Sequence, residues 1–159
     1  MIDEIDYKIL KILQDKARIP NVEVARQIGM APSAVLERIR KLENQEVIDG
    51  YEVRLNPDRF GRSLVAFVFV TVSAHSADES FGDSVAQLSE VQEVHYIAGE
   101  DGYMLKVRVA GTQDLGRLVR DVIGGMAGVT GTRTRIVMAT LKETSRIPLD
   151  AIQPTDPAA

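Results

Sequence analysis

A run of charged and polar side chains between Pro32 and Gln45 has the types and spacing needed to contact DNA. Val35, Ile39 and Leu42 recur every three or four residues, which predicts a helix with these side chains on its inner face. The opposite face and its edges then hold Ser33, Ala34, Glu37, Arg38, Arg40 and Lys41. Because arginine can donate two hydrogen bonds to a guanine edge, the run predicts a helix that enters a major groove of double-stranded DNA.

Each side chain on this face has its own expected role. Ser33 and Ala34 can reach bases or a thymine methyl group, and Glu37 can accept a hydrogen bond from cytosine or hold an arginine in place. Lys41, and Arg54 beyond the helix, are expected to contact phosphate. The same charges also fit the solvated face of an ordinary amphipathic helix, so the neighbouring elements must distinguish the two interpretations.

The neighbouring elements favour the DNA-binding interpretation. Residues 3–16 have an acidic start and then apolar side chains at helical spacing, which predicts a first helix. A shorter helix is expected between a cap at Asn21 and Gly29. After the third helix, Asp49-Gly50 is typical of a two-residue turn between two short strands. Three helices and a hairpin predict a winged helix-turn-helix, with Arg54 in the wing.

The second half of the chain predicts a different fold. Residues 63–73 are rich in β-forming residues and apolar on both faces. A helix, two strands, a second helix and a last strand over 129–141 are expected to follow. The order βαββαβ is typical of a ferredoxin-like antiparallel sheet with both helices on one face. The helices would cover only one face, yet the first strand has Val65, Phe67 and Phe69 on one face and apolar residues on the other, namely Leu64, Val68, Val70 and Val72. The uncovered apolar face predicts a homodimer that packs sheet against sheet.

Composition excludes several kinds of site. The chain has no Cys, so disulfides and thiolate metal sites are ruled out. Its two histidines, His75 and His95, have no partner at a catalytic or metal-binding spacing, so we expect no metal, no cofactor and no enzymatic activity. No apolar run approaches the roughly 18 residues of a membrane span. The acidic start is unlike a secretory signal, so a cytoplasmic protein without a membrane partner is expected.

An ordered set of short motifs is spread along the chain. In order they are Asp3-x-x-Asp6-x-x-Ile9-Leu10, Ala17-Arg18, Val24-Ala25, Ile28-Gly29, Pro32-Ser33, Leu36-Glu37-Arg38-Ile39-Arg40-Lys41-Leu42-Glu43, Ile48-x-Gly50-Tyr51, Asn56-Pro57, Gly99-x-x-x-Tyr103 and Thr132-Arg133-Thr134. Together, over about residues 2–145, they resemble the Lrp/AsnC family of feast/famine regulators. The resemblance implies dimers that often assemble into octamers or other rings, binding of amino acids or related metabolites, and control of metabolic genes.

The resemblance also implies an effector site. In this family the loop between the second and third strands usually has the pattern Gly-Asp-x-Asp-Tyr, whose acidic groups hold a ligand's ammonium between subunits. This chain has Gly99-Glu100-Asp101-Gly102-Tyr103, so Glu100 keeps one carboxylate on a longer stem and Asp101 can replace the second. Across the interface, Thr132 and Thr134 can donate to a ligand's carboxylate. The alternative is a polar, glycine-rich turn that only supports subunit contacts.

The predicted protein is thus a sequence-specific regulator of metabolic genes, tuned by an amino acid or related molecule that alters its assembly. One alternative is a tetrapyrrole-modifying enzyme, because some proteins that resemble the family have that activity on the same fold. Another is an assembly module without DNA binding, which the basic third helix disfavours. The effector, the operator, the sign of regulation and the number of subunits beyond a dimer stay open.

The expected organisation is α+β with two domains. A winged helix-turn-helix is expected over 1–55, a hinge over 56–63, a βαββαβ assembly and sensing domain over 64–145, and a mobile tail over 146–159. Residues 1–62 hold 11 basic and 11 acidic side chains, so the chain's whole net charge of −4 belongs to the rest. A neutral first half removes the objection that an acidic protein repels DNA.

Overall fold

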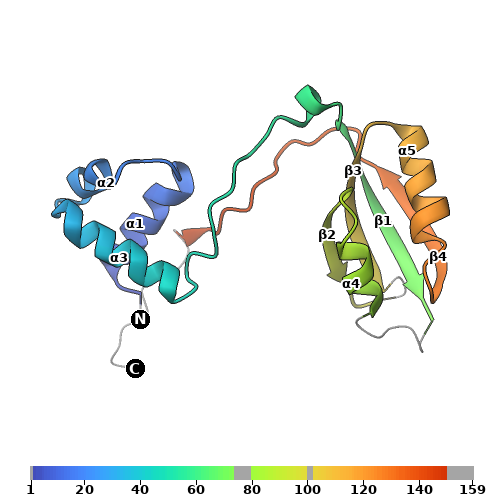
Figure 1. The fold of residues 1–159 in the computed structure, drawn as a ribbon, viewed down its shortest axis with the longest axis horizontal. Coiled ribbons are helices and arrows are strands. Elements are labelled where there is room, and N and C mark those ends of the chain that lie inside the picture. Colours follow the sequence, from blue (N-terminus) through green and yellow to red (C-terminus); the bar gives the residue numbers. More distant parts are fainter. Residues whose placement is uncertain (1, 74–79, 100–101, 150–159) are drawn as a thin grey trace. The chain divides into compact units, whose positions relative to one another are not determined.

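The computed structural model describes residues 2–73, 80–99 and 102–149. The chain divides into two compact units, one of residues 1–54 with 143–159 and one of residues 55–142 (Figure 1). Each unit has its own hydrophobic core. None of the helices in the described residues has the length and apolar character needed to cross a membrane.

Three helices form the first unit: α1 (Glu4–Asp15), α2 (Asn21–Ile28) and α3 (Pro32–Asn44). Their inner faces make one core from Ile9, Leu13, Ile19, Val24, Ala25, Val35 and Ile39. Asp3 caps α1, because its carboxylate accepts a hydrogen bond from the backbone N–H of Asp6 at 2.8 Å. Asn21, the expected cap of α2, is instead the first residue of that helix.

The hairpin expected around Asp49-Gly50 is not formed, and this prediction is wrong. Residues 47–56 contain no strand. The backbone N–H groups of Val47 and Ile48 donate to the carbonyl oxygen of Leu42, at 2.9 and 3.2 Å, and so close the C-terminal end of α3. The residues expected to form the first strand are therefore used to end the helix.

The last described part of the chain lies against α1 of the first unit. The side-chain amide of Gln14 donates to the carbonyl of Ile147 at 3.1 Å and accepts the N–H of the same residue at 2.7 Å. Arg146 Nη1 lies 2.7 Å from Asp15 Oδ1. The tail expected to be mobile from residue 146 thus has defined contacts as far as 149, and residues 150–159 lie outside the described residues.

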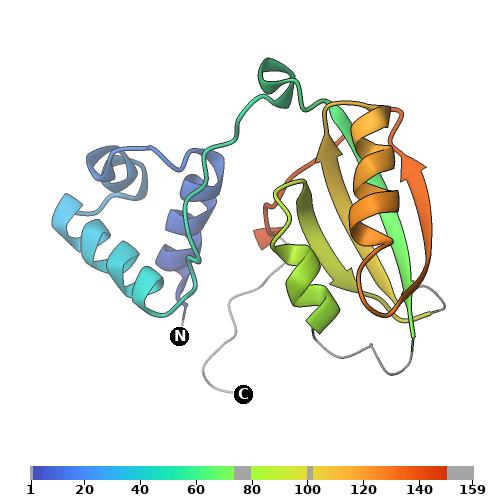
Figure 2. The same cartoon turned by 45° about the vertical axis from the view of Figure 1, so that its right-hand side comes forward.

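The second unit has the predicted order of elements. They are the 3-10 helix η1 (Pro57–Phe60), β1 (Leu64–Val72), α4 (Ser80–Ala86), β2 (Val91–Tyr96), β3 (Tyr103–Val109), α5 (Thr112–Arg117), η2 (Leu118–Ile123) and β4 (Val129–Ile136). The strands form one antiparallel sheet in the order β2-β3-β1-β4. Helices α4 and α5 lie on the same face of this sheet (Figure 2), so the α+β, ferredoxin-like prediction is confirmed.

The last strand ends at Ile136, earlier than its predicted end at Leu141. Ile136 pairs with Ala66 in β1, and β1 itself begins only at Leu64. The N–H of Val137 still donates to the carbonyl of Val65 at 2.9 Å, but Leu141 lies past the start of β1 and is 97% exposed. The apolar residues after Ile136 suggested a longer strand, but an edge strand needs a partner along its full length.

The second helix on the sheet changes its winding in the middle. Helix α5 continues directly into the π-helical turn η2, and the N–H of Gly124 donates to the carbonyl of Val119, five residues earlier, at 2.8 Å. A Cβ at Gly124 would lie 2.9 Å from the backbone oxygen of Arg120. A Cβ at Gly116, within α5, would meet nothing within 4 Å. Steric crowding therefore requires glycine at position 124 but not at position 116.

Alanine at these two positions should have opposite effects. Gly124→Ala should lower the free energy of unfolding by about 1–3 kcal/mol, because the new Cβ forces the backbone of the π-turn to move. Gly116→Ala should raise it by about 0.4–1 kcal/mol, because alanine favours the helix. Urea unfolding followed by circular dichroism measures both changes. Stabilisation by both substitutions would contradict a π-turn that requires glycine.

Candidate DNA interface and effector region

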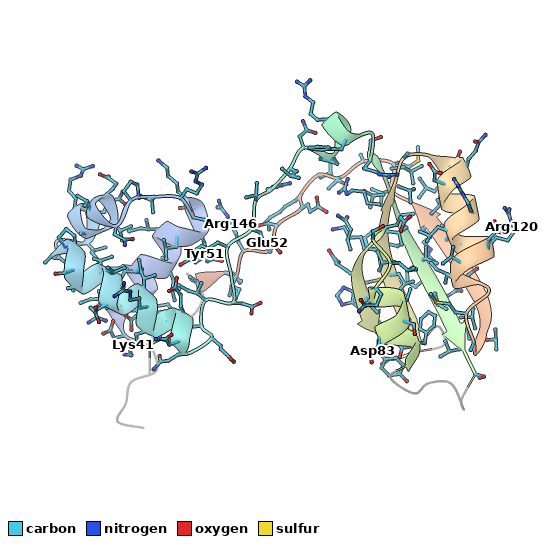
Figure 3. The ribbon with its side chains drawn as sticks, viewed as in Figure 1. Lys41, Tyr51, Glu52, Asp83, Arg120 and Arg146 are labelled. Carbon is cyan, nitrogen blue, oxygen red and sulfur yellow. The ribbon has the colours of Figure 1, made fainter. Side chains whose placement is uncertain are left out.

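The outer face of α3 presents most of the predicted DNA contacts. Ser33, Glu37, Arg40 and Lys41 are exposed and Ala34 is half-buried, while Val35, Ile39 and Leu42 face the core. Lys41 lies near the end of the helix (Figure 3). The predicted division of this helix into an apolar inner face and a polar outer face is confirmed.

The start of α3 has no side-chain cap. Its N-cap residue is Ala31, which has no side-chain oxygen, and Pro32 follows. The amides of the first helical turn therefore lack a cap from this position. Free amides and the positive end of the helix dipole suit an anion such as phosphate.

Glu37 and Arg40 form a pair on the exposed face. Arg40 Nη1 lies 3.6 Å from Glu37 Oε1, and both side chains are largely exposed. A solvated pair at this spacing contributes little to stability, so Arg40 can leave Glu37 for a base edge at little cost. The role expected for Glu37, to hold an arginine in place, stays a prediction.

Arg38 lies apart from that face, in the contact between α1 and α3. Its Nη1 lies 2.6 Å from Asp3 Oδ2 and 2.7 Å from Asp6 Oδ1. The side chain of Asp6 is only 1% exposed. Hydrogen bonds to the two carboxylates raise the pKa of Arg38, and the backbone N–H of Asp6 together with Arg38 lowers the pKa of Asp3. The sequence predicted that the acidic start favours the N-terminus of α1, but not that Asp3 and Asp6 pair with Arg38, although their Asp3-x-x-Asp6 spacing is visible.

Arg54 lies on an extended segment rather than in a wing hairpin. It is 79% exposed, and its Nη2 is 4.0 Å from Glu143 Oε2, at the limit of an ion pair. The same segment contacts α3 through Tyr51, whose hydroxyl donates to Glu43 Oε1 at 2.9 Å (Figure 3). Burial and the Glu43 carboxylate raise the pKa of Tyr51 to about 12. Tyr51 thus connects this segment to α3.

The predicted effector loop is only partly described, because Glu100 and Asp101 lie outside the described residues. Gly99 and Gly102 on either side have positive φ angles of 133° and 84°. The loop closes through the N–H of Ile97, which donates to the carbonyl of Gly102 at 2.7 Å. These φ angles favour glycine, so the tight turn accounts for the glycines of the motif without reference to a ligand.

Tyr103 has a structural role that the sequence analysis missed. It is 6% exposed, and its ring packs edge-on against Phe81 with 4.9 Å between the ring centroids. A Cβ at Gly82 would lie 3.4 Å from this ring, so α4 packs closely against it. Tyr103 belongs to the core between β3 and α4 and is a poor candidate for direct ligand contact.

Thr132 and Thr134 lie on β4, on the helix-covered side of the sheet. They pair with Val70 and Val68 of β1, whose side chains are in the core. Thr134 lines a shallow hollow of about 400 Å³ whose other lining residues are Thr112, Leu115, Gly116, Val119, Arg120 and Ile136. Thr132 and Tyr103 both pair with Val70, from opposite sides of β1, so one strand lies between the threonines of β4 and the start of β3.

The open face of the sheet is apolar along its centre and cationic at both sides. Phe67 and Phe69 of β1 are half-buried there, while Val65 is 7% exposed. The register places basic residues beside them: Lys106 and Arg108 on β3, and Arg133 and Arg135 on β4. The guanidinium of Arg135 stands 5.3 Å from the ring centroid of Phe69. The predicted uncovered apolar face is present, but it is narrower than the sequence suggested.

Two families match the two halves of the chain. Residues 2–49 match the winged helix-turn-helix DNA-binding family, and residues 65–147 match the Lrp/AsnC ligand binding domain. The leucine-responsive regulatory proteins of Klebsiella pneumoniae and Escherichia coli K12 are each 38% identical over 148 residues. That alignment covers 92% of this chain and 90% of each relative.

Solved structures agree with these matches over nearly the whole chain. A Neisseria meningitidis transcriptional regulator in complex with L-methionine has a TM-score of 0.89 at 30% identity, covering 94% of this chain and 98% of the regulator. A feast or famine regulatory protein of M. tuberculosis complexed with L-methionine has a TM-score of 0.85 at 33% identity, covering 92% and 99%. The chain therefore belongs to the Lrp/AsnC family of transcriptional regulators, with a winged helix-turn-helix followed by a ligand-binding domain.

Proposed function

We propose that this DNA-binding regulator recognises its operators through the outer face of α3 and responds to an amino acid bound by its second unit. The observation that supports the DNA contact most directly is the shared exposure of Ser33, Glu37, Arg40 and Lys41 on one side of a helix whose other side is in the core. A helix held in this way presents a fixed surface to a major groove.

The proposed contacts divide by chemistry. Arg40 is released from Glu37 to donate to a guanine, Ser33 and Ala34 lie near bases at the start of the helix, and Glu37 accepts from cytosine. Lys41 and Arg54 contact phosphate and set affinity and register without reading sequence. A cytoplasmic location stays a prediction.

The DNA contacts can be tested by fluorescence anisotropy with the duplex upstream of the protein's own gene and an unrelated duplex. Arg40→Ala should weaken binding to the upstream duplex about 10- to 100-fold and reduce the preference for it, because a base contact is lost. Lys41→Ala should weaken binding to both duplexes and lower the slope of log K against log salt by about 0.9.

Arg117→Ala is the matched control for this test, because it removes an exposed arginine that is paired with Asp114 in the second unit. It should leave both affinities unchanged. Wild-type protein without preference for the upstream duplex under any salt would count against this operator, and a visible-light absorbance from bound pigment would then favour the tetrapyrrole alternative.

We propose that the open face of the sheet is covered by the same face of a second chain. The central apolar stripe contains Phe67 and Phe69, and the cations on both sides suit a polar rim. Dimers formed in this way, assembled further into octamers, would present paired α3 helices to successive major grooves.

Analytical ultracentrifugation of the full chain tests the dimer. Phe67→Glu should convert the dimer into monomers, because it replaces an apolar side chain at the centre of the interface by a charge that loses its hydration on burial. Val122→Glu adds the same charge on η2, at a residue that is 38% exposed outside this face, and should keep the wild-type mass. A dimer that survives Phe67→Glu would exclude this face as the interface.

The effector is proposed to bind between chains, with Glu100 and Asp101 holding its ammonium and Thr132 and Thr134 of a neighbour donating to its carboxylate. Two features support this arrangement. The first is that the threonines on β4 and the end of the loop at Tyr103 lie on different strands, with β1 between them, so two copies can each supply one part of the site. The two solved relatives bound to L-methionine make an amino acid the first ligand to test.

Isothermal titration with L-methionine and a panel of other amino acids tests this site. Thr134→Val should weaken binding of the active amino acid about 10-fold or more, because a hydrogen bond to a charged group is lost. Thr112→Val is the control, since Thr112 lines the same hollow but has no assigned role. Equal losses in both variants would place the ligand in the hollow within one chain and contradict the site between chains.

A further inference from the structure

We infer that Arg38 is a positioning residue, which fixes the recognition helix α3 on α1 through Asp3 and Asp6 and does not contact DNA. The inference rests on the proposed function of α3. The sequence pattern placed Arg38 on the DNA-binding face, and the inference gives it a structural role instead. It also gives Asp3 and Asp6 a part in DNA recognition.

The geometry places one guanidinium nitrogen between two carboxylates. Arg38 Nη1 lies 2.6 Å from Asp3 Oδ2 and 2.7 Å from Asp6 Oδ1, and the arginine side chain is 26% exposed. Arg40, two residues later, is 60% exposed and lies 3.6 Å from its acidic partner. Arg38 therefore makes short contacts with low exposure, whereas Arg40 is in a longer, solvated pair that costs little to break.

The carboxylate of Asp6 explains why the contact must be kept. Among the described residues, Asp6 is the only charged or polar one that is buried, with 1% exposure. A buried carboxylate is tolerated only when it is paired and hydrogen-bonded. Among the interactions identified for Asp6, Arg38 supplies the positive charge and the backbone N–H of Asp3 supplies a further hydrogen bond at 3.2 Å.

The same carboxylates also form the start of α1. Asp3 accepts the N–H of Asp6 at 2.8 Å, and Asp6 accepts the N–H of Asp3, which together make a capping box. One network of three side chains therefore begins α1 and attaches it to the middle of α3. Two carboxylates already pair with Arg38, so its guanidinium would attract a phosphate less strongly than the side chains of Arg40 and Lys41 would.

The position of Arg38 on α3 makes this attachment directional. On the surface of α3, Arg38 lies at the edge between the buried face with Val35 and Ile39 and the exposed face with Glu37 and Arg40. The apolar core alone resists separation of the helices but is less specific about rotation, because apolar contacts are not directional. A fixed ion pair at the edge of the core restrains rotation of α3, and a site must be held within about 0.5 Å of its productive geometry to work.

Salt-dependent DNA titrations of the full chain distinguish positioning from contact. Arg38→Gln and Asp6→Asn should each weaken binding to the preferred duplex about 10-fold, while the slope of log K against log salt stays at the wild-type value. A phosphate contact at Arg38 predicts something different: Arg38→Gln should lower that slope by about 0.9, and Asp6→Asn should leave the affinity unchanged or raise it by removing a negative charge.

Two further variants control for charge and for folding. Glu4→Gln removes an exposed carboxylate from the same first turn of α1, where it pairs with Lys8, and should leave DNA binding unchanged. The double variant Arg38→Met with Asp6→Leu replaces the buried pair by apolar side chains, which commonly preserves folding. It should keep a wild-type circular dichroism spectrum and the wild-type salt slope, but lose preference for the upstream duplex.

The outcomes separate this inference from the proposed function. Wild-type protein that prefers no duplex would overturn the proposed function and the inference with it. Wild-type preference together with a lowered slope in Arg38→Gln, or with undiminished affinity in Asp6→Asn, would overturn the inference alone. Equal weakening by the two single variants at constant slope supports it.

Discussion

The second unit is governed by one strand that must be covered on both faces. β1 is apolar on each side, and apolar surface of this kind is stable in water only when it is buried. Helices α4 and α5 cover the face that contains Val68 and Val70, and both residues are fully buried. The opposite face has Phe67 and Phe69 at its centre. No helix or strand in the described part of this unit packs over that face. The need to cover this face is the physical basis for proposing assembly.

Charges beside the open face limit what can cover it. Arg135 stands over the ring of Phe69, and Lys106 donates to Glu93 at 2.8 Å. The hydrogen bond from Lys106 lowers the pKa of Glu93, which keeps that carboxylate ionised. A partner chain must therefore be complementary to a narrow apolar centre and to the charged side chains on both sides of it. A rim of this kind contributes more to specificity than to affinity.

The first unit has only a small apolar core with which to orient its third helix. Three short helices bury only a few apolar side chains, yet α3 must keep a fixed orientation if its outer face is to match the spacing of bases. The Asp3–Asp6–Arg38 network adds a directional contact to that core. The Tyr51–Glu43 hydrogen bond adds another near the end of α3. Polar contacts of this kind restrain orientation in a way that apolar packing does not.

The sequence by itself determined most of the helices and strands, because these depend on local periodicity and on signals such as Pro32 and Gly29. Its ordered motifs also indicated the family through their resemblance to it. Tertiary structure decided what each candidate residue does. Arg38 and Arg40 have the same side chain two positions apart, and only the proximity of α1 separates a buried ion pair from an exposed one. Tyr103 matched a ligand motif but lies in the core, since α4 packs over β3. The end of β4 at Ile136 depended on pairing with β1, which is distant in sequence. The wing hairpin is absent because Val47 and Ile48 close the C-terminal end of α3.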